Sequence, residues 1–388
     1  MRQVFEAPAR WMDDELTMFD ESVSRFFADK VSPERIAKWR EDGIVEREAW
    51  TEMAAAGLLG LSISPEYGGA GGDLRHEAVL MRHLGLIGAE GWGVPLHNGI
   101  CGGYLSHNGT EEQRQRWLPG LVSGELITAI AMTEPGAGSD LKGIRTTARR
   151  TENGYVLNGQ KTFITNGQLA DLIIVVAKTD ADAGSKGISL IVVDVRDCPG
   201  FSRGRNLDKV GMELGDTSEL FFEDVHVPAE NLLGGVEGKG MYQLMQELPK
   251  ERLLIAIECM AIIESALAHT LDYVQERRAF GQRVWDFQNT QFTLADCKTE
   301  GAIARSFVDE CIIKYVEGTL DASTASMAKY WVSERAQSIV DRAQQFFGGY
   351  GYMNEYPIAQ LYKDVRIKRI YGGTTEIMKL LIARTMEG

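Results

Sequence analysis

The chain of 388 residues lacks the features that mark a disulfide-rich or metal-binding protein. An odd, scattered set of cysteines with no Cys-x-x-Cys pair excludes a disulfide framework or a cysteine zinc site as the organising feature, and it predicts a reducing, cytoplasmic environment. The six histidines form no pair with metal-ligand spacing, so the sequence predicts no metal site. The five cysteines are Cys101, Cys198, Cys259, Cys297 and Cys311.

Positive charge and long apolar runs are also scarce. The chain carries 41 Lys and Arg against 55 Asp and Glu, a formal net charge of −14. Nucleic acids and anionic lipid surfaces are bound through clustered positive charge, so neither is an expected partner. No uninterrupted apolar run approaches the roughly 18 residues that cross a bilayer, and the first ten residues have no signal-peptide core. We therefore expect a soluble protein without membrane insertion.

Several common enzyme motifs are missing as well. The chain has no Gly-x-Gly-x-x-Gly after a strand, no P-loop in the correct register and no Gly-x-Ser-x-Gly. These absences argue against nicotinamide-dependent, nucleotide-hydrolysing and serine-hydrolase chemistry.

The sequence does contain three successive blocks with different hydrophobic periods. Residues 1–125 and 236–388 place apolar side chains at helical spacing, whereas residues 126–235 contain short β-branched runs. The blocks predict a helical N-terminal domain, a central β domain and a C-terminal domain of long antiparallel helices. This order indicates an α+β fold and not the βαβ alternation of a doubly wound sheet.

Local signals predict individual elements within these blocks. Thr110 and Gln113 form a capping box that opens a helix, and Asn153-Gly154 is typical of a two-residue hairpin turn. Strands are expected over residues 172–177, 188–193 and 220–227, and helices over residues 13–30, 241–280, 288–317, 322–347 and 375–384.

Two segments rich in small residues can approach a planar or anionic ligand. Residues 133–140, Thr-Glu-Pro-Gly-Ala-Gly-Ser-Asp, follow an apolar run and let backbone N–H groups come close to an anion or a heteroaromatic ring. Residues 158–167 present Phe163 between hydroxyl-bearing residues, which suits stacking on a planar ring. From the residues alone, a glycine-rich β-turn and a strand between two turns remain open interpretations.

Together with three further segments, these two resemble the acyl-CoA dehydrogenase family. The additional segments are residues 277–281 followed by Gln288, residues 345–352 and residues 371–377, all in the family's order. The resemblance implies an all-helical N-terminal domain, a central β-barrel-like domain and a C-terminal four-helix bundle, with FAD bound between them. It also implies a homo-oligomer, usually a tetramer of two dimers, and electron-transfer flavoprotein as the electron acceptor.

The resemblance also assigns the flavin contacts. Thr133 would reach the pyrimidine edge of the ring and Thr165 would lie near N5. Arg277 suits a diphosphate because guanidinium is planar and always charged. Together with Gln288 and residues 345–349, it would bind the diphosphate and adenosine of FAD held mainly by a neighbouring subunit. The implied contacts are Ile130, Met132, Thr133, Gly138 and Ser139; Phe163, Ile164 and Thr165; Arg277, Phe280, Gln288, Gln345, Phe346, Gly348 and Gly349; and Thr374, Thr375 and Glu376.

The reaction implied is removal of a proton from Cα of an acyl-CoA and transfer of a hydride from Cβ to flavin N5, which leaves a trans-2-enoyl-CoA. A carboxylate can remove such a proton only if burial raises its pKa and the thioester carbonyl is polarised. Residues expected to contact the substrate are Ser139, Tyr242, Arg252, Gly372 and Gly373.

The sequence departs from the family at the usual position of the base. Most members have a glutamate directly after the tyrosine of the C-terminal motif, where this chain has Gly372. The long-chain and isovaleryl branches place the base on a bundle helix before an arginine, and Glu251 stands at that position. Pro249 and the Tyr-Gly-Gly-Thr ending favour the long-chain branch. Glu247 is the competing acid, and a first-turn helix acid is the alternative interpretation of Glu251.

Two other functions stay open at this stage. An acyl-CoA oxidase would pass the electrons to oxygen, and a catalytically inactive member would bind acyl-CoA without turning it over. The absence of the usual base favours inactivity, whereas Glu251 favours a dehydrogenase.

Overall fold

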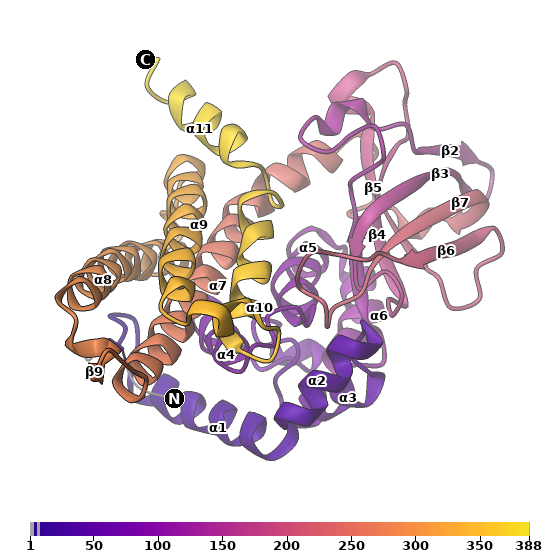
Figure 1. Cartoon of the computed structure of the whole chain (residues 1–388). Coiled ribbons are helices and arrows are strands. Elements are labelled where there is room, and N and C mark those ends of the chain that lie inside the picture. Colours follow the sequence, from indigo (N-terminus) through magenta and orange to yellow (C-terminus); the bar gives the residue numbers. More distant parts are fainter. Residues whose placement is uncertain (1–3, 6–7, 388) are drawn as a thin grey trace.

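The computed structural model describes residues 4–5 and 8–387, and its elements follow the order helices, sheet, helices. Figure 1 shows the sheet on one side of the molecule and the long C-terminal helices on the other, with the N-terminal helices running beneath both. The predicted fold class is confirmed: a helical N-terminal part, a curled central sheet and a C-terminal group of helices.

The N-terminal part consists of helices, and side chains close the first turns of α1, α2, α4 and α6. Asp13 accepts a hydrogen bond from the backbone N–H of Leu16 at 2.9 Å, and the predicted capping box of Thr110 and Gln113 is present in both directions. The helices are α1 (Asp14–Lys30), α2 (Pro33–Asp42), α3 (Arg47–Ala55), α4 (Leu74–Leu86), the π-helical segment η2 (Leu96–Cys101), α5 (Gly102–Asn108) and α6 (Glu111–Val122).

The central sheet has seven strands in the order β1-β4-β2-β3-β7-β6, with β5 paired to β4. The predicted hairpin is confirmed, since Thr151 pairs with Gly154 in an antiparallel ladder. The strands are β1 (Thr128–Ala131), β2 (Thr147–Thr151), β3 (Gly154–Thr165), β4 (Leu172–Lys178), β5 (Ile188–Asp194), β6 (Phe201–Asn206) and β7 (Thr217–Pro228).

The C-terminal part is built around α7, which packs against α8, α9 and α10. The expected long helices are confirmed with ends that differ by a few residues, and α10 is an element that the sequence did not predict. The elements are α7 (Gly240–Glu276), the short hairpin β8 (Arg278–Ala279) and β9 (Gln282–Arg283), α8 (Gln288–Val316), α9 (Ala322–Gln345), α10 (Pro357–Val365) and α11 (Thr375–Arg384).

By length and composition, α7 is long and apolar enough to cross a membrane, and it is the one helix among the described residues with that property. Within the fold, however, 78% of its most apolar window is buried. Helices from both the N-terminal and the C-terminal parts pack on it. Its apolar character is therefore that of a core helix.

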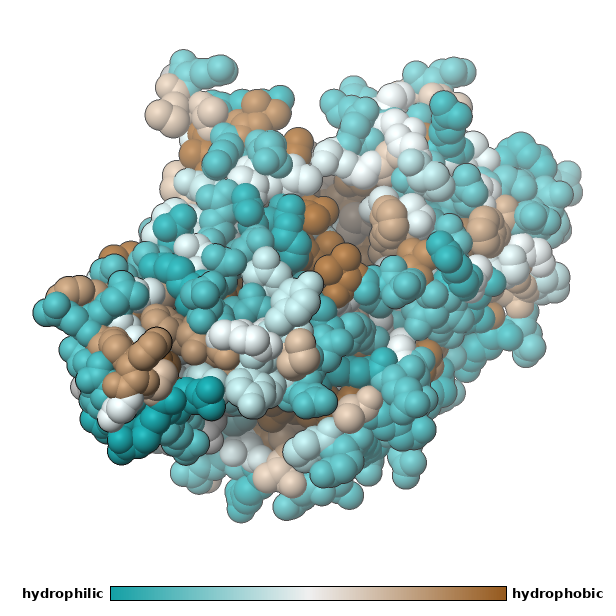
Figure 2. All heavy atoms as spheres, viewed as in Figure 1, coloured by the Kyte–Doolittle hydropathy of each residue, from teal (hydrophilic) through white to brown (hydrophobic). Residues whose placement is uncertain are grey.

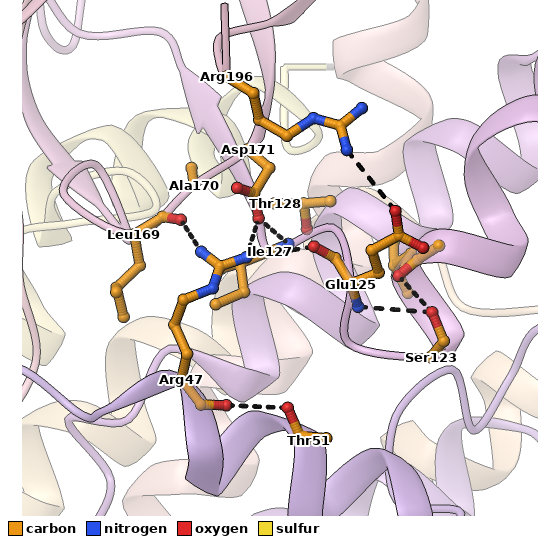
Figure 3. A network of polar contacts seen from close by, with 12 residues as sticks. Arg47, Thr51, Ser123, Glu125, Ile127, Thr128, Leu169, Ala170, Asp171 and Arg196 are labelled. Atoms are coloured by element: carbon orange, nitrogen blue, oxygen red, sulfur yellow. Dashed lines mark hydrogen bonds and ion pairs between the residues drawn. The ribbon is translucent and has the colours of Figure 1, made fainter.

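A polar network fastens the N-terminal helices to the sheet (Figure 3). Arg47, at the start of α3, donates to the carbonyl oxygens of Leu169 at 2.9 Å and Glu125 at 3.1 Å, and it forms an ion pair with Asp171. The same carboxylate of Asp171 accepts the backbone N–H of Ile127 at 2.9 Å. One arginine thus joins a helix to both chain segments that enter adjacent strands.

Candidate active site

Glu251 lies inside α7, eleven residues after the helix begins at Gly240, and is 7% exposed. The alternative of a first-turn helix acid is therefore wrong, because the helix starts well before Pro249 and continues through it. Tyr104 of α5 donates a hydrogen bond to Oε1 of Glu251 at 2.8 Å. Burial raises the pKa of Glu251 to about 7, while the hydrogen bond from Tyr104 acts in the opposite direction.

The competing acid, Glu247, is held by other partners. Its Oε1 lies 2.9 Å from Nδ1 of His107 and accepts a longer hydrogen bond from Asn108 at 3.4 Å. The side chain of His107 is 54% exposed, whereas that of Glu247 is 7% exposed, so the carboxylate lies on the buried side of this pair. Glu247 is thus held by residues of α5, whereas Glu251, which is buried to the same degree, bonds Tyr104.

Gly372 borders the same space as Glu251. Ile255 follows Glu251 by four residues and therefore lies on the same face of α7. A Cβ atom added to Gly372 would lie 2.3 Å from Cδ1 of Ile255, and Gly372 has a φ of +61°. Both the contact and the left-handed backbone disfavour a side chain at this position. The structure thus places Gly372 next to the residue that lies one turn after Glu251 on the same face of α7.

Two buried lysines hold the loop around Gly372. Nζ of Lys329, on α9, donates to the carbonyl oxygen of Gly373 at 2.6 Å. Nζ of Lys368 contacts Glu258 and the hydroxyl of Tyr371, both at 2.8 Å. Because both amines are fully buried, the loop is tied to the bundle on each side.

The other predicted substrate residues are divided between the interior and the surface. Arg252 is buried, donates to Oγ of Ser326 at 3.3 Å, and has an Nε with no hydrogen-bond partner among the described residues. Tyr242 is 62% exposed near the start of α7, and Ser139 is exposed on its turn. Arg252 therefore has an unused donor, whereas Tyr242 presents its ring to solvent.

The two predicted flavin segments lie side by side. The backbone N–H of Thr162 donates to the carbonyl oxygen of Thr133 at 2.9 Å. Nζ of Lys161 bridges the carbonyl oxygen of Met132 at 3.0 Å and the carboxylate of Glu134 at 2.8 Å. Although burial opposes its charge, hydrogen bonds from Lys161 and Thr146 hold the pKa of Glu134 below its ordinary value. A buried ion pair thus fixes the turn to the strand.

These segments present a surface that fits a planar cofactor. Phe163 has a φ of +60° and a 68% exposed side chain at a register shift in β3. No atom lies within 4 Å of a Cβ built on Gly136 or Gly138. Strained backbone of this kind collects at functional sites. By contrast Ile130 and Ile164 are buried in the sheet, so their side chains face away from such a surface.

The C-terminal flavin segment caps the last helix. The Thr374 side chain accepts the backbone N–H of Ile377 at 3.4 Å. Thr375 is buried, and its hydroxyl has no hydrogen-bond partner in the part of the chain that the structure describes. Glu376 is exposed. The segment therefore offers one unused buried hydroxyl next to the Gly372 loop.

A second group of predicted cofactor residues gathers at the far end of the bundle. Arg277 and residues 345–349 line one groove of about 500 Å³, and the guanidinium of Arg277 lies 5.7 Å from the ring centre of Tyr350. Phe280 is 96% exposed and Gln288, the first residue of α8, is also exposed. Arg277 follows Glu251 by 26 residues along α7, about 39 Å at 1.5 Å per residue. Within one subunit, the groove at Arg277 therefore lies far from Glu251.

Sequence reasoning missed the residues that support the site. Tyr104 and Lys329 belong to no motif, and the sequence assigns no role to Glu134 or Lys161 within the two small-residue segments that contain them. Their partners stand far away in the chain, as with Tyr104 and Glu251, which are separated by 147 positions. A buried lysine or tyrosine leaves no periodic signal that distinguishes it from an exposed one.

Taken together, the fold and this site define a helix–sheet–helix enzyme that carries a buried carboxylate on a helix of its C-terminal bundle. Sequence models of the acyl-CoA dehydrogenase N-terminal, middle and C-terminal domains match residues 13–125, 129–225 and 238–387. The chain belongs to the acyl-CoA dehydrogenase family and is an oxidoreductase that converts acyl-CoA.

Individual relatives agree along nearly the whole chain. The long-chain specific acyl-CoA dehydrogenase of Mus musculus is 48% identical over 97% of this chain and 87% of its own length. An isovaleryl-CoA dehydrogenase of Solanum tuberosum is 38% identical over 96% of this chain and 91% of its own. The crystal structure of an acyl-CoA dehydrogenase from Geobacillus kaustophilus is 47% identical, with a TM-score of 0.95 over 98% of this chain and 100% of that one. The predicted family and its fold are confirmed, and the oxidase and inactive alternatives are not favoured.

Proposed function

We propose that Glu251 is the base that removes the α-proton of the acyl-CoA. The observation that carries this proposal is a buried glutamate on the same side of α7 as Ile255, which contacts the place where a Gly372 side chain would stand. Burial raises the pKa of Glu251 to about 7, so its conjugate acid matches the operating pH of a general base. The oxygen not bonded to Tyr104 remains free for the substrate.

The loop at residues 371–373 supplies the second requirement, polarisation of the thioester. Glycines at 372 and 373 keep backbone N–H groups without side chains in the way, and Lys329 and Lys368 hold the loop in place. A fixed donor aimed at the thioester oxygen stabilises the enolate-like charge that develops as Glu251 takes the proton. The proton acceptor and the hydrogen-bond donor to the thioester therefore come from different elements, α7 and the loop before α11.

FAD is the proposed cofactor, since its planar ring fits the surface of Phe163 and the open turn at Gly136 and Gly138. When bound, the flavin accepts the hydride from Cβ. Thr133 and Thr165 would contact the ring, and Thr374 and Thr375 would contact it from the C-terminal side. Lys161 and Glu134 keep the turn in position for this contact.

A homo-oligomer, most simply a tetramer, is part of the proposal. The groove lined by Arg277 and residues 345–349 lies about 39 Å along α7 from Glu251, so its guanidinium would serve the diphosphate of FAD in a neighbouring subunit. The adjoining Phe280, Gln288, Gln345, Phe346, Gly348 and Gly349 belong to the same surface.

The remaining assignments follow from relatives and composition. We propose a long-chain acyl-CoA as substrate, because the relative that is 48% identical is long-chain specific, with Ser139, Arg252, Tyr242, Gly372 and Gly373 lining its path. Electron-transfer flavoprotein is the proposed acceptor. All five cysteines are free, which agrees with a cytoplasmic location.

Replacing Glu251 tests the central assignment. Glu251→Gln keeps the volume and removes the base, so purified yellow enzyme should retain flavin and lose anaerobic bleaching by an acyl-CoA by at least about 100-fold. Glu247→Gln, one turn earlier on α7, is the matched control and should bleach at close to the wild-type rate. Full activity in Glu251→Gln, or loss only in Glu247→Gln, would show that the base is elsewhere.

A further inference from the structure

Glu251 receives one hydrogen bond in the described part of the chain, and it comes from Tyr104. The distance from Oη to Oε1 is 2.8 Å, and Tyr104 is fully buried between η2, α6 and α7. Tyr104 stands on α5, a seven-residue helix, and belongs to a cluster of buried apolar side chains. The hydroxyl therefore has a single polar partner, and that partner is the proposed base.

We propose that Tyr104 is a positioning residue for the reaction, whose hydroxyl fixes the rotamer of Glu251 and stabilises its negative charge. This inference rests on the assignment of Glu251 as the base. The bond occupies Oε1, which leaves Oε2 as the oxygen directed to the substrate proton. In a buried site, a hydrogen bond from a neutral hydroxyl to a charged oxygen is stronger than one between neutral groups.

The surroundings of Glu251 show why such a donor is needed. Burial and, to a smaller extent, the nearby Glu247 raise the pKa of Glu251, which comes to about 7, so the charged form is disfavoured. Arg252 and Lys250 act in the opposite direction but donate no hydrogen bond to this carboxylate. Tyr104 is therefore the donor that keeps the carboxylate ionised near neutral pH.

The other titratable groups around α7 leave Tyr104 as the direct contact. They face Glu251 or its charged neighbours from each packed helix. These groups are Glu77 on α4, Cys101 at the end of η2, His107 on α5, Tyr315 on α8, Lys329 on α9, Lys368 after α10, and Glu247, Lys250, Arg252 and Glu258 on α7. Of these groups, Glu247, Arg252 and Lys250 act on the pKa of Glu251, and they do so through their charge and not through a hydrogen bond.

The variant Tyr104→Phe removes this hydroxyl and keeps the ring. The rate of flavin bleaching should rise with pH along an acid limb near pH 7 in the wild type, because Glu251 must be ionised to act. In Tyr104→Phe the limb should move upward by about one pH unit, since a hydrogen bond to a charged group is lost. At pH 7 the rate should fall about fivefold, and most of it should return at pH 9.

Tyr155→Phe is the matched control. Tyr155 is equally buried and donates to Glu237 at 2.7 Å, but it lies in the sheet. Its removal should leave the acid limb unchanged. An infrared band of a protonated carboxylic acid, present in the wild type at pH 6 and absent in Glu251→Gln, should persist to higher pH in Tyr104→Phe. This measurement needs no substrate.

The outcomes separate this inference from the proposed function. If Glu251→Gln is inactive and Tyr104→Phe keeps the wild-type limb and infrared titration, the role of Tyr104 is wrong and the base assignment stands. If Glu251→Gln is active, both are wrong. Should Tyr104→Phe fail to fold, 3-fluorotyrosine at position 104 provides the second test, because its more acidic hydroxyl should lower the limb. An unchanged or raised limb there would contradict the inference.

Discussion

At the scale of single residues, the site depends on a buried carboxylate at position 251 and on the lack of a side chain at position 372. Glu251 is charged with difficulty because it is buried, and Gly372 leaves open the position that a competing side chain would fill. Replacing Gly372 should therefore cost stability as well as room for the substrate.

Gly372→Ala tests this cost. The new Cβ meets Cδ1 of Ile255 at 2.3 Å on a backbone with φ of +61°, so we expect a loss of about 2–4 kcal/mol in the free energy of unfolding. Gly57→Ala is the control, because Gly57 has a φ of +70° and open space around it; its loss should stay near 1 kcal/mol. Denaturant unfolding measures both, and equal losses would mean that the Ile255 contact is unimportant.

At the scale of elements, the buried pair of Lys161 and Glu134 joins β3 to the turn after β1. Lys161→Met leaves the carboxylate without its cation, so we expect a loss of about 3 kcal/mol in stability together with weaker retention of flavin. Thermal unfolding and the flavin-to-protein absorbance ratio measure the two effects.

The control for this element is an exposed ion pair in the same sheet. Arg150 lies 2.8 Å from Glu237, and its side chain is 66% exposed. Arg150→Met should change stability by less than about 1 kcal/mol and leave the flavin ratio unchanged. A flavin ratio that falls equally in both variants would contradict a specific role for Lys161.

The same scale shows which elements could be predicted from sequence. The long helices and the hairpin at Gly154 have strong periodic or turn signals and were found. Strand β6 was missed because Phe201 is its only large apolar residue and its other side chains face solvent or the strand edge. Helix α10 was missed because nine residues give too short a pattern.

Site residues, like the helices and strands, could be predicted where the local sequence carries a signal. Glu251 and Gly372 could be found because they belong to ordered motifs, whereas Tyr104 and Lys329 could not, since each meets its partner only after folding. Likewise Ile130 and Ile164 share a segment with candidate flavin contacts, but the alternation of a strand turns their side chains into the sheet.

At the scale of the whole molecule, the sheet and the bundle enclose a hollow with apolar side chains along it (Figure 2). Connections such as the ion pair of Arg47 and Asp171 hold the parts together from beneath. The groove at Arg277 lies at the opposite end of α7, which is why a single subunit is an incomplete enzyme under the proposed assembly.

Arg277→Glu tests this arrangement. Reversal of the charge should repel the FAD diphosphate of a neighbouring subunit, so flavin content should fall severalfold while the subunit remains folded, because Arg277 is exposed. Arg278→Glu is the control, since Arg278 is exposed but does not line the groove. Light scattering and flavin absorbance measure assembly and content. Equal losses in the two variants would point to a general effect of charge.

The contact between Gly372 and Ile255 also bears on how this enzyme can evolve. A single substitution that restores glutamate after Tyr371 would place its Cβ against Ile255 on a left-handed backbone. Return of the base to the loop therefore needs the Ile255 side chain to turn aside and a glutamate to adopt a left-handed backbone, so a smaller residue at position 255 would ease it. The backbone at position 372 thus makes the move of the base from loop to helix easier to keep than to reverse.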